Sequence, residues 1–194
     1  DWSSASYWYS IVALCERSEV KLNNFHKNSI QGDSILIKYF EALGVETKFI
    51  ENKIVLTKIK DFSYPKNLNL NLIDSPDLAQ TIAVTCFGLG VSCYLYGLQT
   101  LNIKETKRLI ALKNELTKLG ANLDITESTL KLYKTREIKK NITINTYQDH
   151  RMAMSFAPLS LKVPIFIENP NVVVKSYPKF WNDLKKAGFT IQQT

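Results

Sequence analysis

The sequence predicts a mixed α/β fold built from three copies of one helix-and-strand unit. Three helical patterns each end in a glycine suited to the left-handed position after a helix, at Gly44, Gly120 and Gly188. An alternating apolar and polar pattern, typical of a strand, follows each glycine. Because the same order of elements also recurs before each glycine, we predict the repeated unit to be helix, strand, helix, strand, strand.

The elements follow in this order along the chain. Each unit opens with a helix that is apolar nearly all round and therefore buried on several sides, over residues 3–15, 75–87 and 149–161. A short strand follows, over residues 20–22, 93–96 and 164–167. The second helix is amphipathic, over residues 33–43, 106–119 and 178–187. Two units close with a strand pair, over residues 46–50 with 53–58 and 122–126 with 129–133, and the third stops after one strand, 189–192.

Composition limits the class of protein. With 45% hydrophobic and 22% charged residues over 194 positions, the chain is long enough for one large or two small domains and is not a disordered chain. No run of about 18 apolar residues and no signal-peptide pattern is present, so we expect no membrane span and a cytoplasmic location. Cys15, Cys86 and Cys93 lack the spacing of a metal site and are expected to be reduced.

The net charge of +7 favours an anionic partner. The charge does not by itself choose between nucleic acid and small phosphates, but the basic residues are dispersed, which argues against nucleic acid. The chain also starts at Asp1, without Met, directly in a helical pattern. We interpret it as a piece of a longer protein.

Polar residues gather where the predicted helices begin, and some carry an unexpected charge. Arg108, Arg151 and Lys175 stand near helix N-termini, where the helix dipole disfavours cations. Three such cations at equivalent places indicate an anion held jointly by helix N-termini and basic side chains.

Each candidate also has a simpler interpretation. Asp77 fits a first-turn acid, Glu105 a solvated charge and Ser4 a helix cap. His150 fits a core or capping histidine better than a metal ligand, because no second histidine or cysteine lies nearby in the sequence. The sequence carries no dinucleotide or phosphate-loop glycine fingerprint and no persuasive serine–histidine–aspartate order.

Five strings carry a resemblance to a known family: DWSSASYWY (1–9), SPDLAQT (75–81), IKETKRL (103–109), TYQDHRMAM (146–154) and VVVKSYPKFW (172–181). In this order they resemble the enolpyruvyl transferases of the shikimate pathway, most closely the EPSP synthase family. The resemblance implies βαβαββ units with buried helices and outer mixed sheets, an inside-out α/β barrel of which this chain is a part. It places residues 1–46 in the last unit of a first domain. Residues 47–194 would form the C-terminal domain, which lacks a strand supplied by the protein's N-terminus.

The same resemblance implies a reaction without a metal or other cofactor. The enolpyruvyl group of phosphoenolpyruvate would pass to the 5-hydroxyl of shikimate 3-phosphate, releasing phosphate. Asp77 would be the base that accepts the hydroxyl proton, and Glu105 the acid that protonates the methylene carbon. The implied ligands of shikimate 3-phosphate are Ser4, Tyr7, Asp77 and Lys104. Those of phosphoenolpyruvate are Arg108 and Arg151, whose guanidinium forks suit a carboxylate, and Lys175.

The sequence departs from the family pattern in one loop, where Lys107 replaces the usual aspartate and Asn102 replaces a common arginine. Two alternatives stay open: an enolpyruvyl transferase acting on UDP-N-acetylglucosamine, and a basic RNA-binding module on a related scaffold. In the leading interpretation the partners are the two small substrates and the protein's own N-terminal domain, with no nucleic acid and no membrane. This chain alone is then expected to be inactive, because that domain supplies part of the active site.

Overall fold

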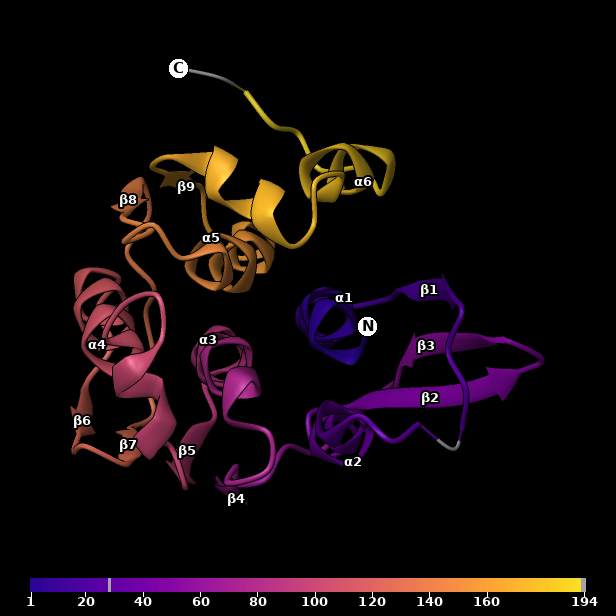
Figure 1. Cartoon of the computed structure of the whole chain (residues 1–194), viewed down its shortest axis with the longest axis horizontal. Coiled ribbons are helices and arrows are strands. Elements are labelled where there is room, and N and C mark those ends of the chain that lie inside the picture. The colour runs from indigo at the N-terminus through magenta and orange to yellow at the C-terminus, as the bar shows by residue number, and fades with distance from the viewer. Residues whose placement is uncertain (28, 193–194) are drawn as a thin grey trace.

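The computed structural model describes residues 1–27 and 29–192, and it has the mixed α/β architecture that the sequence predicts (Figure 1). The helices are α1 (Trp2–Leu14), α2 (Leu36–Glu41), α3 (Ala79–Leu89), α4 (Arg108–Lys118), α5 (His150–Phe156) and α6 (Phe180–Lys186). The strands are β1 (Glu19–Asn23), β2 (Val45–Ile50), β3 (Lys53–Lys58), β4 (Asn67–Asn71), β5 (Ser92–Tyr96), β6 (Leu123–Ile125), β7 (Thr129–Leu132), β8 (Ile142–Ile144) and β9 (Ile165–Ile167).

The described strands form three sheets, which lie around the central helices α1, α3 and α5 (Figure 1). In the first sheet β1 and β2 both pair antiparallel with β3. In the second, the order is β4, β5, β7, β6, with β4 parallel to β5 and the other pairs antiparallel. The third consists of the parallel pair β8 and β9. From β4 to β7 the chain therefore runs strand, helix, strand, helix, strand, strand.

Helices α1, α3 and α5 form the centre of the hydrophobic core. Val12 of α1 and Ile82 of α3 are fully buried. Buried hydroxyls join the same helices, since Ser6 Oγ lies 3.2 Å from Thr81 Oγ1, which lies 3.1 Å from Ser155 Oγ. Because each hydroxyl has a partner, these small polar side chains are tolerated in the core and let the helices pack closely.

The predicted helices and strand pairs are confirmed, with small shifts at their ends. Gly44, Gly120 and Gly188 have φ values of +82°, +100° and +98°, as expected for left-handed residues that end a helix. Two strands, β4 and β8, were not predicted from the pattern. Each of them precedes one of the buried helices, so the complete unit begins with a strand.

Two local predictions are wrong. Residues 189–192 form no strand, because the third sheet ends at β9 and no described strand lies beside this segment. Lys175 is the last residue of the 3-10 helix Pro170–Lys175 and does not begin a helix.

The expected boundary between residues 46 and 47 falls inside β2. β1, before this boundary, and β2 pair with the same strand, β3. Buried side chains from Trp2 to Leu184 also belong to one hydrophobic cluster. A division into domains at residues 46 and 47 stays a prediction, but it would separate strands of one sheet.

Two further expectations concern the cysteines and the membrane. Cys86 and Cys93 are buried free thiols, and Cys15 is a half-buried one. Within the described residues, no helix has the length and hydropathy needed to cross a membrane.

Candidate active site

The starts of helices α3, α4 and α5 meet at one place in the fold. Asp77 lies in the 3-10 helix Pro76–Leu78 that leads into α3, with proline at the first position of that turn. Arg108 is the first residue of α4, and Arg151 is the second residue of α5. Asp149 caps α5, because its side chain accepts a 2.8 Å hydrogen bond from the backbone N–H of Arg151. Two cations and two carboxylates are thus brought together.

Asp77 is shared between two guanidinium groups. Its Oδ1 accepts from Arg108 Nη1 at 2.8 Å, and its Oδ2 accepts from Arg151 Nη2 at 2.9 Å. Lys104 Nζ lies 3.4 Å from Oδ1. Burial alone would raise the pKa of Asp77, but the three neighbouring cations outweigh it and hold the pKa below its ordinary value. Asp77 is therefore ionised at neutral pH.

Arg108 is almost completely buried among carboxylates. Its side chain is 1% exposed. Besides the bond to Asp77, Nε donates to Asp149 Oδ2 at 2.7 Å, and Nη2 donates to Glu105 Oε2 at 2.5 Å. A buried charge is tolerated when it is paired and hydrogen-bonded in this way. The anions that offset this cation at a helix N-terminus are therefore, in the first place, the protein's own carboxylates.

Arg151 has donors that the protein does not fully use. Its Nη1 approaches Tyr7 Oη at 3.4 Å, a long hydrogen bond, and its buried Nε has no hydrogen-bond partner among the described residues. Burial raises the pKa of Tyr7 to about 12, although Arg151 opposes that shift, so the phenol stays neutral. Because an unpaired buried donor costs free energy, Arg151 is the guanidinium better placed to donate to a ligand oxygen.

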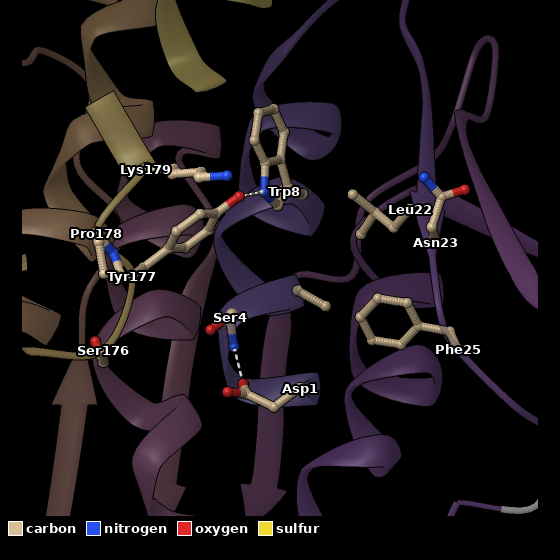
Figure 2. A pocket seen from close by; sticks show the side chains of 11 residues that line it. Asp1, Ser4, Trp8, Leu22, Asn23, Phe25, Ser176, Tyr177, Pro178 and Lys179 are labelled. Carbon is tan, nitrogen blue, oxygen red and sulfur yellow. Dashed lines mark hydrogen bonds between the residues drawn. The ribbon is translucent and has the colours of Figure 1, made fainter. Parts of the chain in front are cut away.

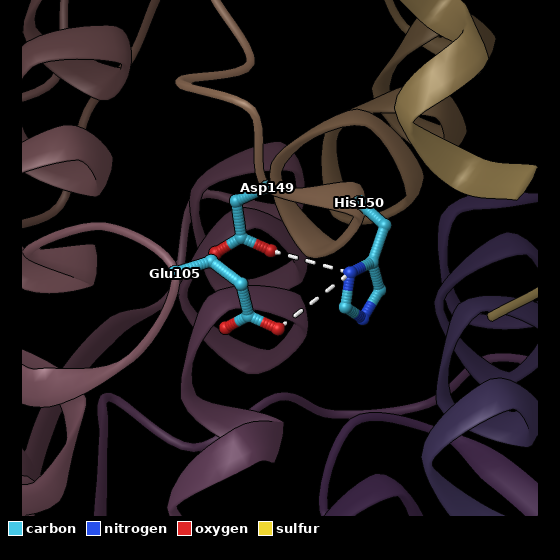
Figure 3. Close-up of side chains that lie close together, drawn as sticks. All are labelled: Glu105, Asp149 and His150. Atoms are coloured by element: carbon cyan, nitrogen blue, oxygen red, sulfur yellow. Dashed lines mark ion pairs between the residues drawn. The ribbon is translucent and has the colours of Figure 1, made fainter. Parts of the chain in front are cut away.

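Figure 3 shows a second set of side chains that could be taken for a metal centre, Glu105, Asp149 and His150. His150 Nδ1 lies 3.9 Å from Glu105 Oε1 and 3.8 Å from Asp149 Oδ1. Both carboxylates already accept hydrogen bonds from the Arg108 guanidinium, which would repel a metal cation placed between them. The donor set therefore does not suit a metal.

His150 is the first residue of α5 and does not act as its cap. Burial lowers the pKa of His150, and the positive charges of Arg151 and Arg108 add to this, while Asp149 and Glu105 oppose it. The imidazole is therefore neutral at pH 7. Its Nδ1 is buried without a hydrogen-bond partner among the described residues.

A cavity of about 470 Å³ lies between α1, β1 and residues 176–179 (Figure 2). Ser4 lines this cavity, and so do Trp8 and Tyr177, whose Nε1 and Oη lie 3.4 Å apart. Ser4 lies inside α1, whose cap is Asp1, since Asp1 Oδ1 accepts a 2.7 Å hydrogen bond from Ser4 N. The interpretation of Ser4 as a cap is therefore wrong.

The structure brings together most residues that the sequence singled out. Asp77, Lys104, Glu105, Arg108 and Arg151 belong to one network of ion pairs, and Tyr7 contacts it. Ser4 and Lys175 do not join this network: Ser4 lines the cavity of Figure 2, and Lys175 is exposed without an ion pair to any described residue.

Sequence reasoning gave no role to Asp149, which is completely buried and binds Arg108. An acid directly at a predicted helix start, two residues before an arginine, was the available signal. Such an acid is usually only a cap, so the sequence offered no reason to expect its second bond.

Comparisons with known proteins agree on one family. The family model described as EPSP synthase (3-phosphoshikimate 1-carboxyvinyltransferase) matches residues 1–184. A 3-phosphoshikimate 1-carboxyvinyltransferase of Bacteroides fragilis (strain YCH46) is 45% identical over 195 residues, covering 99% of this chain and 47% of the relative. One from Neisseria meningitidis (serogroup C) is 32% identical over 183 residues, covering 94% of this chain and 42% of the relative. The chain thus spans about half the length of the curated relatives it matches.

Solved structures show the same fold. EPSP synthase from Acinetobacter baumannii superposes with a TM-score of 0.79 at 23% identity, over 98% of this chain and 46% of that one. The enolpyruvyl transferase NikO from Streptomyces tendae superposes with a TM-score of 0.73 at 15% identity, over 100% of this chain and 44% of that one.

Proposed function

The chain belongs to the EPSP synthase family, and from this membership we propose that it carries part of the active site of a 3-phosphoshikimate 1-carboxyvinyltransferase. The reaction would transfer the enolpyruvyl group of phosphoenolpyruvate to the 5-hydroxyl of shikimate 3-phosphate and release phosphate. The observation that carries this proposal is the network in which Asp77 joins Arg108 and Arg151 beside Glu105. It combines a carboxylate base, a second carboxyl group and two forks for an anion.

In this proposal the strength of Asp77 as a base depends on how many guanidinium donors it binds. Asp77 accepts the proton of the attacking hydroxyl, yet its lowered pKa makes it a weak base in the structure described. The carboxylate of phosphoenolpyruvate would take donors of Arg151 and Arg108 that now bind Asp77. With less of the cationic charge directed at it, Asp77 becomes a stronger base only when this substrate is bound.

Glu105 supplies the second carboxyl group of the proposed reaction. Its side chain is 38% exposed, while Arg108 holds one of its oxygens. In this proposal its carboxyl group protonates the methylene group of phosphoenolpyruvate and removes the proton afterwards, and the partial exposure of the side chain supports that role. Lys104, at 35% exposure, would meet shikimate 3-phosphate from the same loop.

The proposed roles of three other residues depend on their positions around this network. Tyr7 would offer its neutral hydroxyl to shikimate 3-phosphate from beside Arg151. Ser4 would contact that substrate from the cavity of Figure 2. Lys175 would reach phosphoenolpyruvate only through its long exposed side chain.

We propose further that a second domain of the same protein completes the site, since the chain covers 47% of its Bacteroides fragilis relative. Closure of two domains would exclude water from the reacting groups. The 194-residue chain alone is then expected to form no product.

The test is a chimera of the Bacteroides fragilis relative in which these 194 residues replace the aligned segment. Phosphate release is measured with phosphoenolpyruvate and either shikimate 3-phosphate or UDP-N-acetylglucosamine. We expect turnover when the acceptor is shikimate 3-phosphate and none when it is UDP-N-acetylglucosamine. Asp77→Asn should abolish this turnover, whereas Asp74→Asn, a change of an exposed acid three residues away, should retain it. A folded chimera that turns over neither acceptor, or only the nucleotide sugar, contradicts the proposal.

A further inference from the structure

Glu115 is a buried carboxylate on the same helix as Arg108. It lies two turns further along α4, and its side chain is 1% exposed. Its Oε2 accepts a 2.9 Å hydrogen bond from the backbone N–H of Asn145, and its Oε1 accepts a 2.8 Å bond from Tyr147 Oη. Lys118 pairs with Oε2. Glu115 thus binds a segment of chain that leads from β8 to α5.

That segment contains a backbone turn of an unusual kind. The backbone N–H of Asp149 donates to the carbonyl oxygen of Thr146 at 2.9 Å. Between them, Tyr147 and Gln148 have φ values of +53° and +58°. Two successive left-handed residues are typical of a type I′ turn, which favours asparagine and glycine. A tyrosine and a glutamine there are strained, and such strain persists only where surrounding contacts hold it.

The last residue of this turn is Asp149. Its Oδ2 accepts from Arg108 Nε, and its Oδ1 accepts from the backbone N–H of Arg151. Helix α4 therefore holds the segment 145–149 at both ends, through Glu115 at Asn145 and Tyr147 and through Arg108 at Asp149.

We propose that Glu115 is a positioning residue, which holds the strained turn 146–149 so that Asp149 orients Arg108 and the start of α5. The proposal deepens the function proposed above and rests on it as far as phosphoenolpyruvate binding is concerned. The orientation of Arg108 does not depend on that function. Glutamine is an imperfect replacement for Glu115, because its single acceptor oxygen cannot serve both the N–H of Asn145 and the hydroxyl of Tyr147, and it carries no charge to pair with Lys118.

The kinetic test uses the chimera with three variants. Glu115→Gln is expected to weaken phosphoenolpyruvate, as KM, by about tenfold, the effect of one lost buried hydrogen bond, and to change the KM of shikimate 3-phosphate less. Lys118→Gln, which removes the ion pair but leaves both bonds from Glu115 to the turn, should stay within about twofold of the parent. Gln148→Gly should restore most of the loss in Glu115→Gln, because glycine adopts the left-handed conformation without strain and Gln148 is exposed.

A second measurement does not need activity. The labelled protein is the 194-residue chain itself, which has arginine only at 17, 108, 136 and 151. The Nε–H signal of Arg108 can therefore be assigned, after ¹⁵N-arginine labelling, as the one that Arg108→Lys removes. Its exchange with solvent should accelerate at least about tenfold in Glu115→Gln and remain unchanged in Lys118→Gln. Equal effects of the two variants, unchanged exchange in Glu115→Gln, or failure of Gln148→Gly to restore binding would each overturn the proposal. An inactive parent chimera with the expected exchange pattern would instead contradict the proposed function alone.

Discussion

Asp77→Asn separates the two tasks that the structure gives to this carboxylate. Asp77 is the proposed base, and it also occupies donors of Arg108 at 2.8 Å and of Arg151 at 2.9 Å that an anionic substrate would use. Asparagine keeps the shape of the side chain and one acceptor oxygen, but loses the negative charge. Turnover and substrate binding should therefore change in opposite directions.

The two magnitudes follow from different interactions. Removal of a general base lowers kcat by about 100-fold or more. A carboxylate bonded to a guanidinium contributes about 1.5 to 3 kcal/mol, and the 25% exposure of Asp77 allows water to screen part of it. With that competitor neutralised, the affinity for phosphoenolpyruvate should rise about three- to tenfold.

The assay combines steady-state phosphate release by the chimera with calorimetric titration of phosphoenolpyruvate without the second substrate, so that no turnover occurs during the titration. Asp74→Asn is the matched control, since it removes one exposed negative charge three residues away. A kcat near that of the parent would remove Asp77 from the role of base. A phosphoenolpyruvate affinity that falls tenfold would show that Asp77 does not compete with this substrate for the arginines.

Three further outcomes are expected. Arg151→Lys should weaken phosphoenolpyruvate binding more than shikimate 3-phosphate binding in the same titrations, because lysine cannot present a two-pronged fork; equal weakening would count against it. His150 has a pKa lowered by burial, so the unfolded chain binds a proton that the folded chain resists, and stability falls as the pH drops through about 6.5. His150→Gln should flatten the dependence of Tm on pH between about 7 and 5, and an unchanged slope would refute this. Gly188 has a φ of +98°, and no atom lies within 4 Å of the Cβ that alanine would add, so Gly188→Ala introduces backbone strain without a clash. This variant should lower the unfolding free energy by about 1 kcal/mol in urea titrations, whereas an unaltered midpoint would mean that the backbone relaxes.

The repeated architecture could be predicted because it depends on local signals. Gly44, Gly120 and Gly188 mark helix ends that only glycine forms without strain, and the structure gives all three a positive φ. The nearly uniform apolar character of α1 and α3 likewise indicated burial on all sides, which the core confirms. Strand β4 was missed because three of its five residues are asparagine, and β8 because its three residues stand between two asparagines.

The candidate site was predictable as a set of residues, but not as a set of bonds. Arg108 and Arg151 drew attention as cations at helix starts, which pointed to an anion. The sequence could not show that Asp149 and Asp77 would reach them from two other elements. The turn at Tyr147 and Gln148 was also hidden, because neither residue type signals a left-handed conformation.

The balance of charge in the site then limits how a substrate can bind. The network holds comparable numbers of cations and carboxylates: Lys104, Arg108 and Arg151 against Asp77, Glu105 and Asp149. A further negative group is not balanced by this nearly neutral network, so apart from the unpaired Nε of Arg151 we expect an anionic substrate to obtain its donors by displacing a carboxylate from its guanidinium. Asp149 is completely buried and caps α5, whereas Asp77 and Glu105 are partly exposed. The carboxylates free to yield are therefore the two with proposed roles in proton transfer, which couples anion binding to the release of the groups that move the protons.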